Sequence, residues 1–314
     1  MKDNNNTDIL NIVRAPVNGK LPPRRRLESC LQLSDLTTKM ATHIICHVIV
    51  DHKALLADER FSVANAFLQR VTSTHLCNHK LTSEGIVMRY KGEVFQLHEE
   101  YKTMTLTRSV YEHLVMFYFL FAHPKTDEER SVVWNYWKIN SKKNLMETTS
   151  NEPTPKSPTV DTSLAEVETL REKIFSTRLG MECYKKLDEW TAPDKPTVNG
   201  TIAFMHRPNG IDVRRVSYNQ AWRYLFGKSQ TDMDLLYRHL SIHSHPIYDG
   251  LMQYQDQGLK DEGFDGVPLY LSASFLAYLC RLFLRLLPQG DKIFDGEFTE
   301  QEQQVFKALS RVVN

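Results

Sequence analysis

The first group of residues that could do chemistry is a short polar stretch at the start of the most apolar part of the chain. Arg108 and Glu112 are four residues apart, so on a helix they share one face. His113 lies about 140° further round the same helix from Arg108. One interpretation is an Arg108–Glu112 ion pair that holds the helix, with His113 at the boundary of the core. The other is a functional site, because charges placed where a bundle core begins cost desolvation energy unless something uses them.

The second group is the segment from Tyr237 to Pro246. On a helical wheel Ser241 falls on the same side as Tyr237, where a small hydroxyl side chain lets a neighbouring helix approach closely or donates a hydrogen bond. His245 precedes Pro246, and a residue before proline is disfavoured in helical geometry. We therefore expect His245 at the helix end, where the helix dipole favours an imidazolium.

The same segment also raises the question of a metal. His239 and His243 are four residues apart, a spacing that suits metal binding, but a metal needs a third and usually a fourth ligand. The sequence shows no obvious carboxylate partner nearby, so solvent-facing histidines are the simpler interpretation and we expect no metal or other cofactor. A metal-dependent hydrolase that uses His239, His243 or His245 stays open as an alternative.

Well-known enzyme motifs are absent from the sequence. It has no glycine-rich phosphate loop, no Gly-x-Ser-x-Gly elbow, no His-Glu-x-x-His and no paired zinc cysteines, which argues against Rossmann and P-loop enzymes. The 39 basic and 38 acidic residues give a net charge of +1, so the total charge demands neither a nucleic acid nor a membrane surface as partner.

Composition and segment lengths describe a globular protein. The 314 residues suggest one or two domains, and the chain is 41% hydrophobic and 25% charged. The longest apolar run, residues 114–122, is too short to span a membrane, which needs about 20 residues. No secretory signal begins the sequence, and the five cysteines never form a Cys-x-x-Cys, so we expect reduced thiols, a cytoplasmic location and no membrane partner.

Apolar spacing of three and four residues predicts an all-α, multi-helix bundle. A first helix is expected to be capped by Ser34 or Asp35. Gly85 and Gly92 interrupt the pattern further on, and a small hairpin is expected within residues 191–216. The remaining predicted helices cover residues 60–77, 106–122, 127–138, 164–190, 218–226, 231–244, 268–287 and 299–313.

These elements predict four regions along the chain. Residues 1–33 lack helical periodicity and are expected to form a flexible, disordered arm, in which Arg24–Arg26 is a solvated charge run or, alternatively, a phosphate contact. Residues 34–140 form a helical half. Residues 141–162 hold three prolines and many serines and threonines, which predicts a linker or long loop. Residues 163–314 form a second helical half that packs on the first.

Three short segments resemble a bacterial all-helical family that is catalogued only as a domain of unknown function. The family pattern is an Arg-x-x-x-Glu turn on a central helix and a later Tyr-x-x-Leu-Ser-x-x-x-His element. The resemblance covers roughly residues 40–285 and implies a helical fold without naming an activity. The matching segments are Thr107-Arg-Ser-Val-Tyr-Glu-His113, Trp222-Arg-Tyr-Leu-Phe-Gly-Lys228 and Tyr237-Arg-His-Leu-Ser-Ile-His-Ser-His245.

Arg108 and His113 are also similar to the signature of the HEPN superfamily, in which four to six residues separate an arginine from a following histidine; here four residues separate them. This resemblance implies a metal-independent endoribonuclease of toxin or phage-defence type, with RNA and a second copy of the chain as partners. His113 would act as general acid and base at the 2′-hydroxyl or the leaving oxygen, and Arg108 would stabilise the phosphorane charge.

The sequence therefore favours an interaction or regulatory protein with a buried polar network, and it keeps the ribonuclease and the metal-dependent hydrolase as alternatives. The candidate site residues are Arg108, Glu112, His113, Ser241 and His245.

Overall fold

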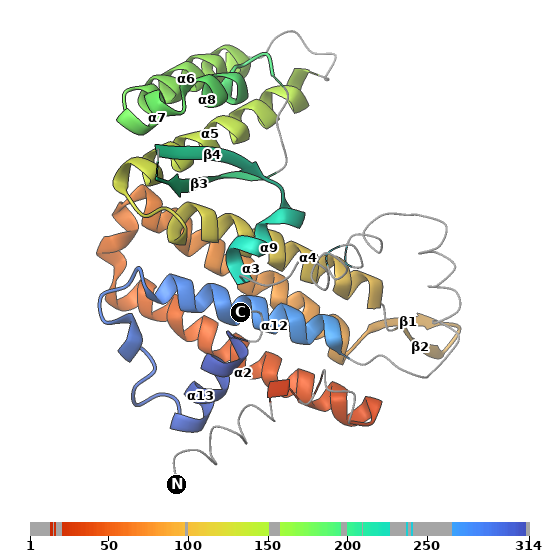
Figure 1. The fold of residues 1–314 in the computed structure, drawn as a ribbon. Coiled ribbons are helices and arrows are strands. Elements are labelled where there is room, and N and C mark those ends of the chain that lie inside the picture. The colour runs from red at the N-terminus through yellow and green to blue at the C-terminus, as the bar shows by residue number, and fades with distance from the viewer. Residues whose placement is uncertain are drawn as a thin grey trace. The chain divides into compact units, whose positions relative to one another are not determined.

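The computed structural model shows a mainly helical protein (Figure 1). It describes residues 13–14, 16, 21–97, 100–150, 158–195, 200–208, 210–226, 237, 240 and 266–311. Within these ranges the strands belong to two small antiparallel hairpins, and helices make up the rest of the framework. The prediction of an all-α multi-helix bundle is confirmed.

The chain divides into two compact units. The first unit comprises residues 1–114 and 222–314, and the second comprises residues 115–221. This division differs from the predicted halves, 34–140 and 163–314, because the end of the chain returns to helices near its beginning. The chain passes from one unit to the other within α4 (Glu100–Phe117) and within α9 (Tyr218–Phe226).

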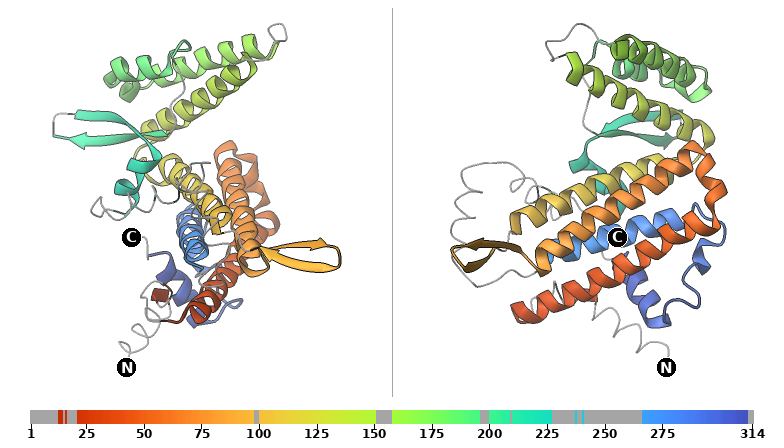
Figure 2. Two further views of the ribbon diagram at one scale, coloured as in Figure 1. Left: turned by 90° about the vertical axis from the view of Figure 1, so that its right-hand side faces the viewer. Right: turned by 180° about the vertical axis from the view of Figure 1, so that it is seen from behind.

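The first unit is built around α12 (Val267–Leu284), which packs against α2 and α3 (Figures 1 and 2). Nearly every residue of α12 is buried, as expected of a helix that is apolar on all sides. α12 is also long and apolar enough to cross a membrane by length and composition, but 78% of it is buried within the fold, which is typical of a core helix. Besides the parts of α4 and α9 that belong to this unit, its other described helices are α2 (Pro23–Asp51), η1 (Lys53–Ala57), α3 (Glu59–Ser83), η3 (Gly290–Lys292) and α13 (Glu300–Leu309).

α2 begins earlier than the sequence predicted. The flexible arm was expected to reach residue 33, with Ser34 or Asp35 as the helix cap, but α2 already starts at Pro23. A proline fits the first helical turn, because its missing N–H would have had no partner there and its φ is already helical. Arg24 of the arginine cluster lies in this turn, 3.5 Å from the carboxylate of Glu28.

The second unit contains α5, α6 and a hairpin that packs on α5. The predicted linker over residues 141–162 is largely helical, because α5 continues to residue 150 and α6 starts at residue 158; residues 151–157 lie outside the described ranges. Buried Lys143 helps to explain why α5 continues into the predicted linker, since its ammonium donates to the carbonyl of Ala192 at 2.8 Å. The helices of this unit are η2 (Tyr118–Ala122, a π-helical turn), α5 (Asp127–Ser150), α6 (Pro158–Phe175), α7 (Arg178–Glu182) and α8 (Tyr184–Thr191).

Each hairpin consists of two antiparallel strands. The hairpin expected within residues 191–216 is confirmed. The other was not predicted from the sequence, where Gly92 indicated only an interruption. Lys91 and Gly92 have φ values of 51° and 87°, and this pair of left-handed residues matches the two-residue turn that suits the twist of paired strands. The strands are β1 (Ile86–Tyr90), β2 (Glu93–Leu97), β3 (Thr201–Arg207) and β4 (Gly210–Val216).

Candidate functional site

The ion pair that the spacing of Arg108 and Glu112 predicts is present on α4. Arg108 Nε donates to Glu112 Oε1 at 2.8 Å. The two side chains are 22% and 27% exposed, so the pair is mostly withdrawn from water. A charged hydrogen bond in such surroundings is stronger than one on an open surface, and leaving either partner alone there is costly.

Tyr237 joins this pair from the second polar segment of the sequence. Its hydroxyl donates to Glu112 Oε1 at 3.2 Å and accepts from Arg108 Nη2 at 3.4 Å. The guanidinium carbon of Arg108 also lies 5.4 Å from the centre of the Tyr237 ring, within range of a cation–π interaction. These contacts form a closed triangle, which we call the Arg108–Glu112–Tyr237 cluster.

Aromatic packing supports the cluster from one side. The ring of Tyr237 lies 5.6 Å from that of Tyr111 on α4, and Tyr111 in turn lies 5.4 Å from Phe275 on α12. Tyr111 and Phe275 are buried. Residue 237 is therefore anchored to the core of the first unit both by its ring and by its hydroxyl.

Electrostatics favour one charge state for the cluster. Burial works against the charge of Arg108, but the hydrogen bond and charge of Glu112 outweigh it, and the pKa of Arg108 lies above its ordinary value. Burial, and then the negative charge of Glu112, raise the pKa of Tyr237. At neutral pH the cluster thus holds an arginine cation and a protonated phenol, which acts as a hydrogen-bond donor.

His113 lies apart from the cluster, on another side of α4. Its Nδ1 donates to the carbonyl of Ser109 at 2.7 Å, and its ring stands edge-on to Phe67 of α3 at 6.0 Å. A carbonyl only accepts, so the proton sits on Nδ1. Of the predicted site residues, the structure brings Arg108 and Glu112 together and adds Tyr237, and it directs His113 towards α3.

Ser241 and His245, the other two predicted site residues, lie outside the described residues, as do His239 and His243. Across the residues that the structure does describe, no group of three or more histidine, cysteine, aspartate or glutamate side chains is arranged to hold a metal ion. The metal hypothesis was based on residues beyond those ranges and stays a prediction.

Sequence reasoning missed a second polar system, which runs from α12 through α3 to α2. His75 Nδ1 lies 2.8 Å from Ser272 Oγ, and His75 Nε2 lies 2.9 Å from Ser34 Oγ. The same hydroxyl lies 2.9 Å from His79 Nδ1, and His79 Nε2 lies 3.4 Å from Asp35 Oδ1. We call this series the histidine chain. Ser34, expected as a helix cap, is instead a mid-helix member of it.

The chain of hydrogen bonds has one consistent direction when both histidines are neutral. The carboxylate of Asp35 only accepts, so His79 Nε2 carries a proton and His79 Nδ1 accepts from Ser34. Ser34 then accepts from His75 Nε2, and His75 Nδ1 accepts from Ser272. His75 is fully buried, and burial lowers its pKa to about 3. A sequence signal did exist, since His75 is seven residues from Leu68 on the apolar face of α3.

The fold and the cluster define a mainly α-helical protein in which two chain segments far apart in sequence meet at a half-buried arginine–glutamate–tyrosine triangle. A model of a family of unknown function, DUF5677, matches residues 96–264. This match covers more than half of the chain, which therefore belongs to that family and confirms the predicted likeness to a domain-of-unknown-function family. The matched region includes all three cluster residues. No curated protein and no solved structure matches the chain.

Proposed function

We propose that the protein is an interaction or regulatory module without catalysis, in which the Arg108–Glu112–Tyr237 cluster holds Tyr237 against α4. The observation that carries this proposal is the position of the Tyr237 hydroxyl between the two charged groups. Polar clusters withdrawn from water cost desolvation energy, and in some proteins they are retained because they specify one packing of the chain.

The chemistry of the cluster also supports a binding role. A catalytic arginine stabilises charge that develops on a substrate, so its guanidinium must face the reacting atoms. Arg108 instead faces a carboxylate and a phenol of its own chain. His113, which follows Glu112 in the sequence and was the candidate proton-transfer residue, is held by Ser109 towards α3.

Replacing Arg108 with alanine tests this proposal. Arg108→Ala leaves Glu112 half-buried without its cation, and we expect the free energy of unfolding to fall by about 1–3 kcal/mol. Arg24→Ala is the matched control in the same unit, because Arg24 also forms an ion pair with a glutamate four residues later, Glu28, but is 91% exposed. Urea unfolding of the two variants measures the difference. Equal losses would contradict the proposal.

The interaction role itself is tested by chemical cross-linking in cells that express the parent protein or Arg108→Ala. We expect a defined set of partners with the parent and their loss with the variant. Partners retained by a variant that has lost the cluster would show that the cluster is not needed for their recognition, which would contradict the proposal.

RNA cleavage of the HEPN type is a second candidate; the tautomer of His113 favours it, whereas the direction of its ring, towards α3, does not. Donation from Nδ1 to Ser109 leaves Nε2 as the basic nitrogen of a half-buried ring, which is the form a general base needs. We expect His113→Ala to abolish cleavage of a labelled RNA without lowering the melting temperature, whereas the control His47→Ala cleaves as the parent does. Absence of cleavage by the purified parent would remove this candidate.

A further inference from the structure

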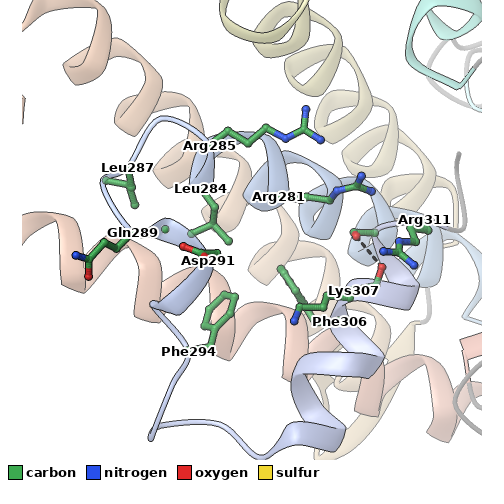
Figure 3. A pocket seen from close by; sticks show the side chains of 12 residues that line it. Arg281, Leu284, Arg285, Leu287, Gln289, Asp291, Phe294, Phe306, Lys307 and Arg311 are labelled. Atoms are coloured by element: carbon green, nitrogen blue, oxygen red, sulfur yellow. Dashed lines mark hydrogen bonds between the residues drawn. The ribbon is translucent and has the colours of Figure 1, made fainter. Parts of the chain in front are cut away.

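A pocket in the first unit is lined in part by basic side chains from the ends of two helices (Figure 3). Arg281 and Arg285 come from the end of α12, and Lys307 and Arg311 come from the end of α13. Among the described residues, Asp291 is the one acidic residue that lines it. The cavity volume is about 460 Å³, within the range of small-molecule sites.

The basic side chains of the pocket outnumber its acidic ones, since four of them line it against Asp291 among the described residues. In the part of the chain that the structure describes, no carboxylate is paired with any of the four. Nη1 of Arg281 is buried there and has no hydrogen-bond partner among the described residues. Burial, and then the charges of Arg285 and Arg311, lower the pKa of Arg281. An acceptor with negative charge would relieve both the repulsion and the unmet donor.

The helix ends explain why these cations are tolerated together. α12 and α13 both direct their C-terminal ends to this region, and the partial negative charge of a helix C-terminus favours nearby cations. That effect is worth only about 0.3–1 kcal/mol at a surface position, and it supplies no hydrogen-bond acceptor for Arg281 Nη1.

The wall of the pocket is apolar. Leu284, Phe294 and Phe306 line it, and the last two rings meet edge to face at 5.6 Å. Gly290 brings the next loop directly onto the end of α12, because a Cβ there would lie 2.1 Å from the carbonyl oxygen of Leu284. The apolar wall and the basic rim are thus held together by close backbone packing, which only glycine permits.

We propose that this pocket binds a small organic anion that carries an apolar body, with a carboxylate or phosphate group on the arginines and a hydrocarbon or aromatic part on the phenylalanines. Charge complementarity selects the head group and the apolar wall selects the body. A bare phosphate would leave the wall exposed to water, and a neutral alcohol would leave the arginine cluster without a counter-charge. The ligand site is separate from the Arg108–Glu112–Tyr237 cluster and does not depend on the function proposed for it.

Isothermal titration calorimetry of the full chain with four probes tests the ligand class. Octanoate and octyl phosphate have both parts, octan-1-ol lacks the charge, and inorganic phosphate lacks the apolar body. We expect one octanoate or octyl phosphate per chain, with at least about tenfold weaker binding of the other two. The stronger of the two amphiphiles identifies the head group. Octan-1-ol or inorganic phosphate binding as tightly as octanoate would overturn the proposal.

Single substitutions locate the site. Arg281→Gln and Arg311→Gln are each expected to weaken octanoate binding about tenfold, because each removes a charged hydrogen-bond donor. Asp291→Asn is expected to bind at least as tightly as the parent, since it removes a repelling charge. Arg70→Gln, at an exposed position of α3 outside the pocket, is the matched control.

Circular dichroism confirms that each variant is folded, and Arg311 is exposed, so its replacement is compatible with folding. Unchanged octanoate binding in both Arg281→Gln and Arg311→Gln would overturn the assignment. So would a chain that binds no octanoate but forms a dimer that Arg311→Gln abolishes, because the pocket would then serve a second copy.

Discussion

Two regions of the molecule contain the same kind of ion pair, between an arginine and the glutamate four residues after it, in different surroundings. Arg108–Glu112 and Arg178–Glu182 both join Nε to Oε1 at 2.8 Å. The first pair is 22% and 27% exposed and holds Tyr237, whereas the second is 84% and 38% exposed on the short helix α7. The motif Arg-x-x-x-Glu therefore determines that the ion pair forms. Its burial determines whether the pair also holds a third side chain.

The pKa shifts separate the two pairs by cause. For Arg178 the hydrogen bond and charge of Glu182 raise the pKa, with burial only a minor opposing effect. For Arg108 the largest effect is burial, which lowers the pKa and which Glu112 has to overcome. Exposed pairs contribute little to stability, because water solvates and salt screens both charges. The comparison predicts that polar groups in this protein matter in proportion to their burial.

The largest effect is expected at His75, which is fully buried. The unfolded chain protonates His75 below its ordinary pKa of 6.5, while the folded chain keeps it neutral down to about pH 3. Between these values the unfolded state binds one more proton, so the free energy of unfolding falls as the pH falls, by about 1.4 kcal/mol per pH unit. Urea unfolding across this range measures the slope.

His75→Gln serves to isolate that slope, because glutamine does not titrate. We expect the pH dependence of unfolding to decrease by about one proton in His75→Gln and to stay unchanged in the control His47→Gln, whose ring lies near the surface. A parent slope that survives in His75→Gln would mean that another group causes it and that burial of His75 does not govern acid stability.

The next effect is expected at the carboxylates of the two pairs. Glu112→Gln keeps the shape and one acceptor but leaves the half-buried charge of Arg108 unbalanced, and we expect a loss of about 1–3 kcal/mol. Glu182→Gln changes the exposed pair in the same way and should leave the melting temperature unchanged. Thermal unfolding of both variants decides the comparison, and equal shifts would break it.

The smallest effect is expected from the tyrosine hydroxyl. Tyr237→Phe removes one donor and one acceptor but keeps the ring near the guanidinium of Arg108 and next to Tyr111. We expect a loss of about 1 kcal/mol, the usual value of one hydrogen bond. Tyr237→Ala removes the ring as well and should cost more. If Tyr237→Phe matched Tyr237→Ala in urea unfolding, the hydroxyl alone would hold residue 237.

Sequence patterns predicted the local structure well and the long-range partners poorly. The four-residue spacing was sufficient to predict the Arg108–Glu112 ion pair, because both residues lie on one helix face. The strongly apolar composition of residues 268–287 was sufficient to predict the core helix α12. The hydroxyl of Tyr237, 125 residues from Glu112, could not be assigned, since nothing local fixes which distant segment meets α4.

Proline and serine misled the sequence analysis for a physical reason. Pro23 and Pro158 look like signs of loops but occupy the first turns of α2 and α6, where a proline loses no hydrogen bond. Ser34 looks like a helix cap, yet it lies within α2, and its hydroxyl contacts two histidines of α3. A proline can lie in a loop or in the first turn of a helix, and a serine can cap a helix or form hydrogen bonds from its middle. Tertiary packing decides between these positions.

The split of the first unit along the chain has a consequence for its synthesis. α2 and α3 emerge from the ribosome long before α12, the helix against which they bury their apolar faces. Residues 115–221 must be made in between, and bringing together the ends of so long a connection costs chain entropy. The nascent protein therefore exposes apolar helix faces until α12 is translated, a period in which chaperones would protect it from aggregation.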